Sequence, residues 1–482
     1  MSKPVAQIAR EIPLKVGGSS IFGRYPKISI EKTYNMILSD GWLVPYAGYK
    51  KVSNISETGW GRGVFSSPSY NHLIVVISNN VYQIDNNLIA TKIGELNTSF
   101  GDVFIDENGA KQIAICDEKD IWIFNYEAST FTKANIDFNP MHISFHNGRF
   151  MAAVRDYPVF RLSNSNNGLI WPNDAQHVGA FNSKADLPKA CIRIPGKGNN
   201  ILVMGEIVTE LWVDVGYSLF PYQRTSAFNI DYGCANNATV ASGDNFVVWL
   251  GINEKSTPAI MYTNGSEVRQ ISTDGINYRL AALKHPENSC AFLFKQDGHL
   301  LYHITFYDVE DNLSLVYDFN TDKFYHLCDK NGDYHIARKV AYFNNTYFFV
   351  SLNDGNFYEF DTQFFTADDE EINRIRICNN VRLPDSSGFV VNRMAFTLEQ
   401  GNIPTSTLNS NDPELPRIDT SISINGGESF SNFVGTKMNM IGNRKNIFCL
   451  YQLGFCNDFV SQFRFHGFGR FVATDGVVNI TQ

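Results

Sequence analysis

The chain has 482 residues, a formal net charge of −9 and a charged fraction of 18%. This length predicts two or three domains or one large repeat fold. The acidic balance argues against tight electrostatic binding of phosphate backbones, because that affinity comes from clustered Lys and Arg. The low charged fraction favours a protein that buries part of its surface against partners.

Aromatic residues make up 13% of the chain and suit the half-buried faces of β-sheets. The eight cysteines form no Cys-x-x-Cys pair and are too sparse for a disulfide scaffold. The N-terminus has no apolar signal region, and no run approaches the ~18 apolar residues of a membrane span. We therefore expect a mostly β protein made in a reducing cytoplasm, with no membrane span.

Along the chain, five segments share one pattern: an apolar strand, a polar turn, and a second strand that ends in an aromatic residue. They span residues 75–82, 114–122, 292–302, 315–325 and 348–358. Each segment predicts a β-hairpin, because Asn, Asp and Gly supply the left-handed backbone of tight turns. The most helix-like stretches are residues 274–283 and the acidic segment near residue 368, and both are short.

The aromatic residues of successive strands recur at intervals of 38 to 52 residues, at Tyr82, Trp122, Phe160, Trp212, Tyr262 and Tyr302. A four-stranded propeller blade takes roughly 40–50 residues. The spacing therefore predicts a β-propeller of about six to eight blades over residues 59–361. An irregular run of hairpins in β-sandwiches is the alternative interpretation.

Two regions flank this periodic part. Residues 1–58 form an expected N-terminal arm and interface region, and residues 362–482 an expected C-terminal β region. The Pro-, Asn- and Ser-rich stretch 401–416 is typical of a long exposed loop. We expect an all-β fold in which the two flanks build an additional β domain beside the propeller.

Motifs that carry chemistry are missing from the sequence. Residues 195–200 lack the spacing of a phosphate-binding loop. His299 and His303 fall on one face of a strand, but no third metal ligand is near them in sequence. There is no Gly-x-Ser-x-Gly elbow, and no cysteine has an identifiable histidine partner. The sequence predicts no enzyme, no catalytic residue, no metal site and no cofactor.

One motif, residues 421–430, resembles the Asp-box hairpin of sialidase-type propellers, with Asn425 where an Asp is usual. That hairpin is a structural turn that caps a blade. A glycosidase needs a carboxylate pair at the bond that it cleaves, and nothing marks one in this sequence. A sialidase-type enzyme is therefore a remote alternative.

Residues 219–235 read Leu-Phe-Pro-Tyr-Gln-Arg-Thr-Ser-Ala-Phe-Asn-Ile-Asp-Tyr-Gly-Cys-Ala. This run resembles the central motif of the packaged-DNA stabilization family, the tail accessory or tail nozzle proteins of short-tailed bacteriophages (podoviruses). The matching positions are Phe220, Pro221, Tyr222, Gln223, Arg224, Gly233 and Cys234, and Arg62 and Gly63 start the first hairpin as in that family. Weaker matches follow in order from residue 34 to about residue 470.

The resemblance implies a structural virion protein: a homo-hexameric nozzle ring in the tail, below the ring of the portal-adaptor (head completion) protein. Such a ring closes the DNA exit channel, stabilises packaged double-stranded DNA without sequence-specific binding, and serves as the ejection conduit. It also implies a tail needle or plug and a tailspike or tail fibre as partners, with assembly in the host cytoplasm. The motif residues would then serve the fold or assembly.

Within the motif, Phe220, Pro221 and Tyr222 are expected to anchor a loop, because two large rings flank a residue of fixed φ. Arg224 is expected to hold loop carbonyls or a carboxylate, and Gly233 to allow a strained backbone turn. The main alternative function is a carbohydrate- or receptor-binding propeller of a tail fibre or lectin. A lectin predicts glycan binding by monomers, whereas a nozzle predicts ring assembly that depends on the adaptor.

Overall fold

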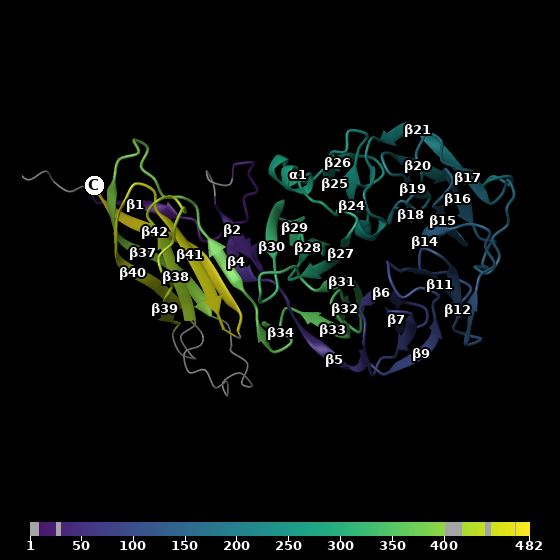
Figure 1. Ribbon diagram of the computed structural model, residues 1–482, viewed down its shortest axis with the longest axis horizontal. Helices are drawn as coiled ribbons and strands as arrows, with labels where there is room; N and C mark the ends of the chain where they lie inside the picture. The colour runs from purple at the N-terminus through teal and green to yellow at the C-terminus, as the bar shows by residue number, and fades with distance from the viewer. Residues whose placement is uncertain (1–8, 26–29, 401–416, 439–444, 468) are drawn as a thin grey trace, which may run out of the picture.

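The computed structural model describes residues 9–25, 30–400, 417–438, 445–467 and 469–482. Figure 1 shows a ring of small sheets on the right and a pair of long packed sheets on the left. The ring is a β-propeller, and the packed sheets form a β-sandwich. Both the predicted propeller and the predicted additional β domain are confirmed. The predicted loop at 401–416 lies outside the described residues.

The propeller has seven blades within the described part of the chain, each a small antiparallel sheet. The first four are β6 (Gly61–Ser67), β7 (His72–Ile77), β8 (Asn80–Ile84) and β9 (Ala90–Glu95); β10 (Phe104–Glu107), β11 (Gln112–Cys116), β12 (Ile121–Asn125) and β13 (Thr130–Lys133); β14 (Pro140–His146), β15 (Arg149–Val154), β16 (Val159–Leu162) and β17 (Val178–Ala180); and β18 (Ala190–Arg193), β19 (Asn200–Met204), β20 (Thr209–Asp214) and β21 (Tyr222–Ile230).

The fifth blade also carries the short helix η1 (Asn237–Thr239), and the helix α1 (Asp274–Leu280) follows it. The last three blades are β22 (Gly233–Cys234), β23 (Ala241–Ser242), β24 (Val247–Ile252), β25 (Pro258–Thr263) and β26 (Val268–Gln270); β27 (Ser289–Gln296), β28 (His299–Phe306), β29 (Leu313–Asp318) and β30 (Lys323–Leu327); and β31 (Ala337–Phe343), β32 (Thr346–Ser351), β33 (Gly355–Asp361) and β5 (Gly48–Glu57).

A buried hydrophobic cluster lies between each pair of neighbouring blades, all the way around the ring. Inner strands such as β7 and β11 are therefore covered on both faces, and nearly every residue in them is buried. This explains why the hairpins read as continuous apolar runs instead of alternating patterns. All five predicted hairpins are present.

The ring is closed by a strand from the N-terminal flank. The strand β5 pairs with β33 as the outer strand of the seventh blade, and β31 contacts β6 of the first blade. The propeller thus includes residues that precede position 59. Closure by a strand from the far end of the chain makes the propeller dependent on pairing between residues some three hundred positions apart.

The sandwich is built from both ends of the chain. Its strands are β1 (Ala9–Leu14), β2 (Lys32–Tyr34), β3 (Met36–Ser39), β4 (Trp42–Pro45), β36 (Arg374–Ile377), β37 (Phe389–Gln400), β38 (Arg417–Ser423), β39 (Val434–Lys437), β40 (Lys445–Cys456), β41 (Val460–His466) and β42 (Phe471–Thr481). One sheet has the order β3-β4-β42-β37-β40 with β1 on β42, and the other includes β2-β36-β41-β38-β39. Their facing side chains form one core.

The two domains share a sheet, because β30 of the sixth blade pairs in parallel with β2, and β2 pairs with β36. Arg376, fully buried on β36, fixes the N-terminal arm beside this junction. Its guanidinium donates to the carbonyls of Lys15, Val16 and Ser19 at 2.8–3.1 Å and to the Glu31 carboxylate at 2.8 Å. The junction is therefore held by backbone pairing and by a buried ion pair.

Two local expectations are corrected by the structure. The acidic segment near residue 368 is a tight turn between β34 (Thr366–Ala367) and β35 (Glu370–Glu371), with Asp368 and Asp369 at φ of 51° and 69°, and is not helical. The Asp-box-like segment is a turn in which Asn425 accepts a hydrogen bond from the Ser429 N–H, but it lies between sandwich strands β38 and β39 and caps no blade. The predicted helix at 274–283 is confirmed as α1.

Candidate functional site

The family-like motif lies at the outer edge of the fourth blade, where it leads into β21. The Phe220 ring packs edge-on against Phe160, Trp212 and Tyr222, with ring centroids 5.9–6.3 Å apart. Tyr222 is buried, and its hydroxyl lies 2.9 Å from Nδ1 of His146 in the third blade. The Pro221 carbonyl accepts the Val215 N–H at 2.8 Å. These contacts hold the loop between β20 and β21 onto the third and fourth blades.

Arg224 reaches a fully buried carboxylate. Its guanidinium lies 3.4 Å from Glu210, whose side chain is 0% exposed, while the Arg224 side chain is 30% exposed. Glu210 also accepts the Ser183 N–H at 2.7 Å and the Trp212 indole N–H at 2.8 Å. Arg224 therefore supplies the positive charge beside a carboxylate that otherwise has only neutral donors. The preceding motif residue, Gln223, is exposed on β21.

Gly233 opens the fifth blade for a reason other than the predicted one. Its φ lies outside the left-handed region, so no strained turn is present. Instead, a Cβ at this position would lie 2.2 Å from the Glu206 carbonyl carbon and 2.3 Å from the Ile207 nitrogen. The glycine is required because two backbones touch there. Cys234 is fully buried beside it, and burial raises the pKa of its thiol to about 12.

Arg62 and Gly63 lie on β6, the inner strand of the first blade. The buried Arg62 guanidinium donates to the carbonyls of Thr98, Phe100 and Gly101 at 2.6–2.9 Å, and so holds the loop that leads to the second blade. A Cβ on Gly63 would lie 3.1 Å from the Val103 carbonyl oxygen. Burial lowers the pKa of Arg62 to about 10, which leaves it charged at neutral pH.

The sequence-derived residues thus fall into two separate groups, one on the first blade and one where the fourth blade meets the fifth. Their contacts join neighbouring blades and loops. Within the described part of the chain, none of them lines the hollows at the sixth and seventh blades.

A second polar cluster, which the sequence did not indicate, crosses the inside of the propeller ring. On β31, Arg338 donates to Asp102 at 2.7 Å, with the two side chains 6% and 10% exposed. The half-buried Lys339 amine donates to the carbonyls of Ala238 at 2.5 Å and Ala291 at 3.0 Å. We call these residues, together with Asn237 and Glu118, the axial network.

Asn237 and Glu118 bridge blades that are not neighbours. The Asn237 amide, in η1 of the fifth blade, donates to the Glu118 carboxylate of the second blade at 3.0 Å. It also donates to the Met141 carbonyl of the third blade at 2.7 Å. Side chains therefore span the ring from one side to the other and close the propeller axis.

Another unpredicted feature is an apolar row on the outer strand of the sandwich, the β40 patch, made of Ile447, Tyr451 and Phe455. Their side chains are 66%, 64% and 62% exposed. The strand β40 pairs with β37 alone among the described strands, so its other edge offers unpaired backbone groups there. A long edge strand with exposed apolar side chains is a surface suited to contact with another chain.

His299 and His303, the two histidines noted in the sequence, have structural partners. His299 lies 2.9 Å from the Asp318 carboxylate, and His303 lies 3.1 Å from the Tyr46 hydroxyl. His142 is enclosed between blades, and burial lowers its pKa to about 3. Within the described residues, His, Cys, Asp and Glu form no group of three that could hold a metal ion. That same part of the chain contains no helix with the length and apolarity to cross a membrane.

A family profile described as the β-propeller of bacteriophage P22 Gp10 matches residues 23–364. The matched stretch runs from β2 through β33 and so takes in the whole propeller. The chain belongs to this family. It is a structural protein of a phage particle, from a family that stabilises packaged DNA.

Comparison with solved structures returns proteins of low sequence identity. A streptogramin B lyase is 12% identical, with a TM-score of 0.44, over 66% of this chain and 97% of the lyase. A virginiamycin B lyase from Staphylococcus aureus is 10% identical, with a TM-score of 0.44, over 65% of this chain and 98% of that one. A chain of a mitotic checkpoint complex is 12% identical, with a TM-score of 0.42, over 65% of this chain and 93% of its own length. No curated protein matches the sequence.

Proposed function

We propose that the chain is the subunit of a homo-hexameric tail nozzle, which closes the DNA exit channel of a short-tailed phage and later conducts the DNA during ejection. The observation that carries this proposal is the family match over residues 23–364. In the proposal the ring docks below the portal-adaptor ring, holds a tail needle or plug, and supports a tailspike or fibre. The particle assembles in the host cytoplasm.

The closed propeller axis supports a channel formed by several copies. A duplex, whose major groove alone is about 12 Å wide, has no passage along an axis that hydrogen bonds of about 3 Å cross. DNA must then pass between subunits. The net charge of −9 favours a channel that does not hold DNA. Acidic side chains repel the phosphates, and no release of counterions from the DNA would favour binding.

The β40 patch supplies a surface for contact between copies. Three large apolar side chains along one unpaired edge lose their contact with water when a neighbouring subunit covers them. A ring requires a contact between two different surfaces of each copy, and an edge strand can provide one of them.

The test is complementation of phage heads assembled without this chain. We expect such heads to lose their DNA and to retain it when the purified protein is added. Tyr451→Asp on the β40 patch should abolish rescue, whereas Tyr278→Asp on α1, at a residue that is 56% exposed, should rescue normally. Heads that retain DNA without the chain would contradict the nozzle. Full rescue by Tyr451→Asp would contradict the β40 patch as a contact surface.

The proposal includes no catalytic role. We expect no turnover of sialyl or other glycosidic substrates by the purified protein. Turnover that a single Asp or Glu substitution abolishes would overturn this part of the proposal and favour the enzyme alternative.

A further inference from the structure

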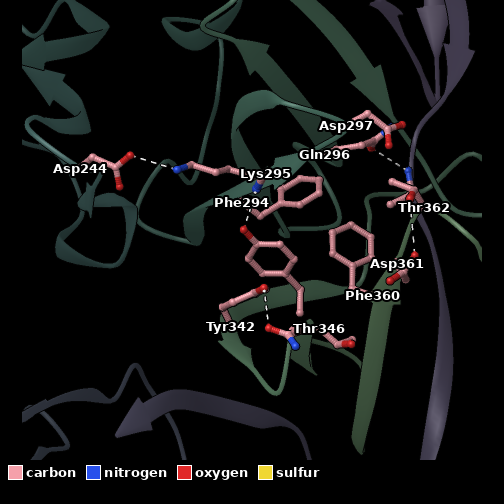
Figure 2. Close-up of a pocket in the computed structure, with 13 residues that line it drawn as sticks. Asp244, Phe294, Lys295, Gln296, Asp297, Tyr342, Thr346, Phe360, Asp361 and Thr362 are labelled. Atoms are coloured by element: carbon pink, nitrogen blue, oxygen red, sulfur yellow. Dashed lines mark hydrogen bonds and ion pairs between the residues drawn. The ribbon is translucent and has the colours of Figure 1, made fainter. Parts of the chain in front are cut away.

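An open hollow of about 600 Å³ lies between the sixth and seventh blades. Its walls come from the β27–β28 hairpin, the β31–β32 hairpin and the end of β33, as Figure 2 shows. This volume falls in the range of small-molecule sites, about 300–1,000 Å³. None of the family-motif residues lines it.

The floor of the hollow is aromatic. Phe294 and Phe360 are buried in the wall with ring centroids 4.8 Å apart, and Tyr347 meets Phe294 edge-on at 5.8 Å. Tyr342 stands at the rim, 52% exposed and 4.8 Å from the Tyr347 ring. The Tyr347 hydroxyl accepts the Lys295 N–H at 3.1 Å, which fixes its ring in place. Of these rings, Tyr342 offers the exposed aromatic surface, and the buried rings behind it hold that side of the hollow in place.

The rim carries carboxylates and an amide. Asp297, at the tip of the β27–β28 turn, makes no hydrogen bond or ion pair within the described part of the chain. Asp361 and Asn345 face the same space, while Lys295 is paired with Asp244 at 3.0 Å. The rim therefore offers several acceptors and an amide, and its one lysine is already neutralised.

A second hollow of about 480 Å³ continues the first one towards the sandwich. Asp297 and Thr362 line both hollows, and Arg470 lines the second. The two hollows form a groove that suits an extended ligand. We call it the blade 6–7 groove.

We propose that the blade 6–7 groove binds a neutral saccharide chain. The C–H face of a sugar ring packs on the exposed face of Tyr342, because these C–H bonds carry a slight positive charge and the aromatic face a negative one. The Asp297 and Asp361 carboxylates accept hydrogen bonds from sugar hydroxyls, and Asn345 can donate and accept. Charge-assisted bonds of this kind are stronger than neutral ones.

The charge of the groove decides between ligand classes. Three aspartates stand against Lys295 and Arg470, so the groove keeps a net negative charge, which disfavours an acidic saccharide or a phosphate. A basic peptide is the other candidate, but the carboxylates stand at an open rim, where water and salt weaken ion pairs. The exposed ring of Tyr342, with carboxylates beside it, instead favours a ligand that has one apolar face and a polar edge. This combination describes a pyranose ring.

The inference is independent of ring assembly and is tested on the isolated protein. Saturation-transfer difference NMR is measured with maltotriose, mannotriose and triacetylchitotriose, with trigalacturonic acid, and with a tetra-arginine peptide. We expect transfer to the ring C–H protons of at least one neutral trisaccharide and none to trigalacturonic acid. Tyr342→Ala and Asp297→Ala should each weaken that binding by about tenfold or more. The matched control, Tyr278→Ala, removes an equally exposed tyrosine on α1 and should bind normally.

Three results would overturn the inference: no transfer to any neutral trisaccharide, unchanged binding by Tyr342→Ala, or binding of tetra-arginine alone. The last result would make the groove a docking site for a basic protein segment. Circular dichroism of each variant checks the fold, and Tyr342 and Asp297 are exposed, so their removal should leave the unfolding midpoint unchanged. Rescue of DNA retention by Tyr342→Ala would show separately that nozzle assembly does not need the groove.

Discussion

Replacing Arg224 with Ala tests whether the family-like motif serves the fold or an interface. The substitution removes the positive charge that lies 3.4 Å from the fully buried Glu210 carboxylate. Glu210 keeps the Ser183 N–H at 2.7 Å and the Trp212 indole at 2.8 Å, so the loss is smaller than for an unpaired buried charge. A hydrogen bond to a charged group contributes about 1.5–3 kcal/mol, and we expect a loss of about 2 kcal/mol.

Urea unfolding followed by tryptophan fluorescence measures this loss, and Glu210→Gln provides the second half of a double-mutant cycle. Without Arg224, neutralising Glu210 should restore about 1 kcal/mol, because the buried charge is then no longer uncompensated. In wild type, the same change should destabilise the protein. Incorporation of Arg224→Ala into DNA-filled heads is measured in parallel, at a temperature where the variant is folded.

If Arg224→Ala unfolds within about 0.5 kcal/mol of wild type, the ion pair does not support the blade and this reasoning is refuted. Lost incorporation with unchanged stability would place Arg224 at an interface. Loss of both stability and incorporation would confine it to the fold.

Arg376→Met should cost about 3–5 kcal/mol in urea unfolding, because it leaves the Glu31 carboxylate and several carbonyls of the N-terminal arm unpaired; a cost below about 1 kcal/mol would contradict the buried ion pair. Gly233→Ala should cost about 3 kcal/mol, since its Cβ would overlap the backbone at Glu206, and an unchanged midpoint would refute the close approach. Burial lowers the pKa of His142 and of His335 to about 3, below the ordinary 6.5, so the unfolded chain binds more protons between these values. The free energy of unfolding should then fall as the pH drops from 6.5 towards 3, by up to about 1.4 kcal/mol per pH unit for each histidine. Urea unfolding at pH 7, 5.5 and 4.5 checks this, and a free energy of unfolding that does not change with pH would contradict it.

The aromatic spacing predicted the propeller because it reports a repeated position within the blades. Tyr82, Trp122, Phe160, Trp212 and Tyr262 all lie on the third strand of their blades. Tyr302 lies on a second strand instead, which shows that the period tracks the number of strands per blade and not a strict motif. The hairpins were predictable for a similar reason, because local turns and apolar runs determine each of them.

Features made by distant parts of the chain were not predictable. The sequence of residues 48–57 contains no signal of their pairing with β33, because strand partners some three hundred residues apart leave no local sequence pattern. The axial network joins Glu118 to Asn237 and Asp102 to Arg338, and the blade 6–7 groove combines turns of several blades. Only the folded ring brings these side chains together.

For the motif residues, the sequence indicated the right positions but only part of the physical reason for each residue. The need for a glycine at position 233 was predicted, but its cause is contact between backbones and not a left-handed turn. The expectation that Arg224 holds a carboxylate agrees with its contact to Glu210. Its role in assembly remains a prediction.

The most direct test of the central proposal is a cryo-EM reconstruction of virions that carry this chain, at a resolution where side chains identify it. We predict a closed ring of six copies on the tail axis below the adaptor, with DNA in the space between subunits and each propeller axis blocked. The β40 patch should be covered by a neighbouring copy. A chain that is missing from the tail, or that occurs as separate copies away from the DNA path, would contradict the proposal.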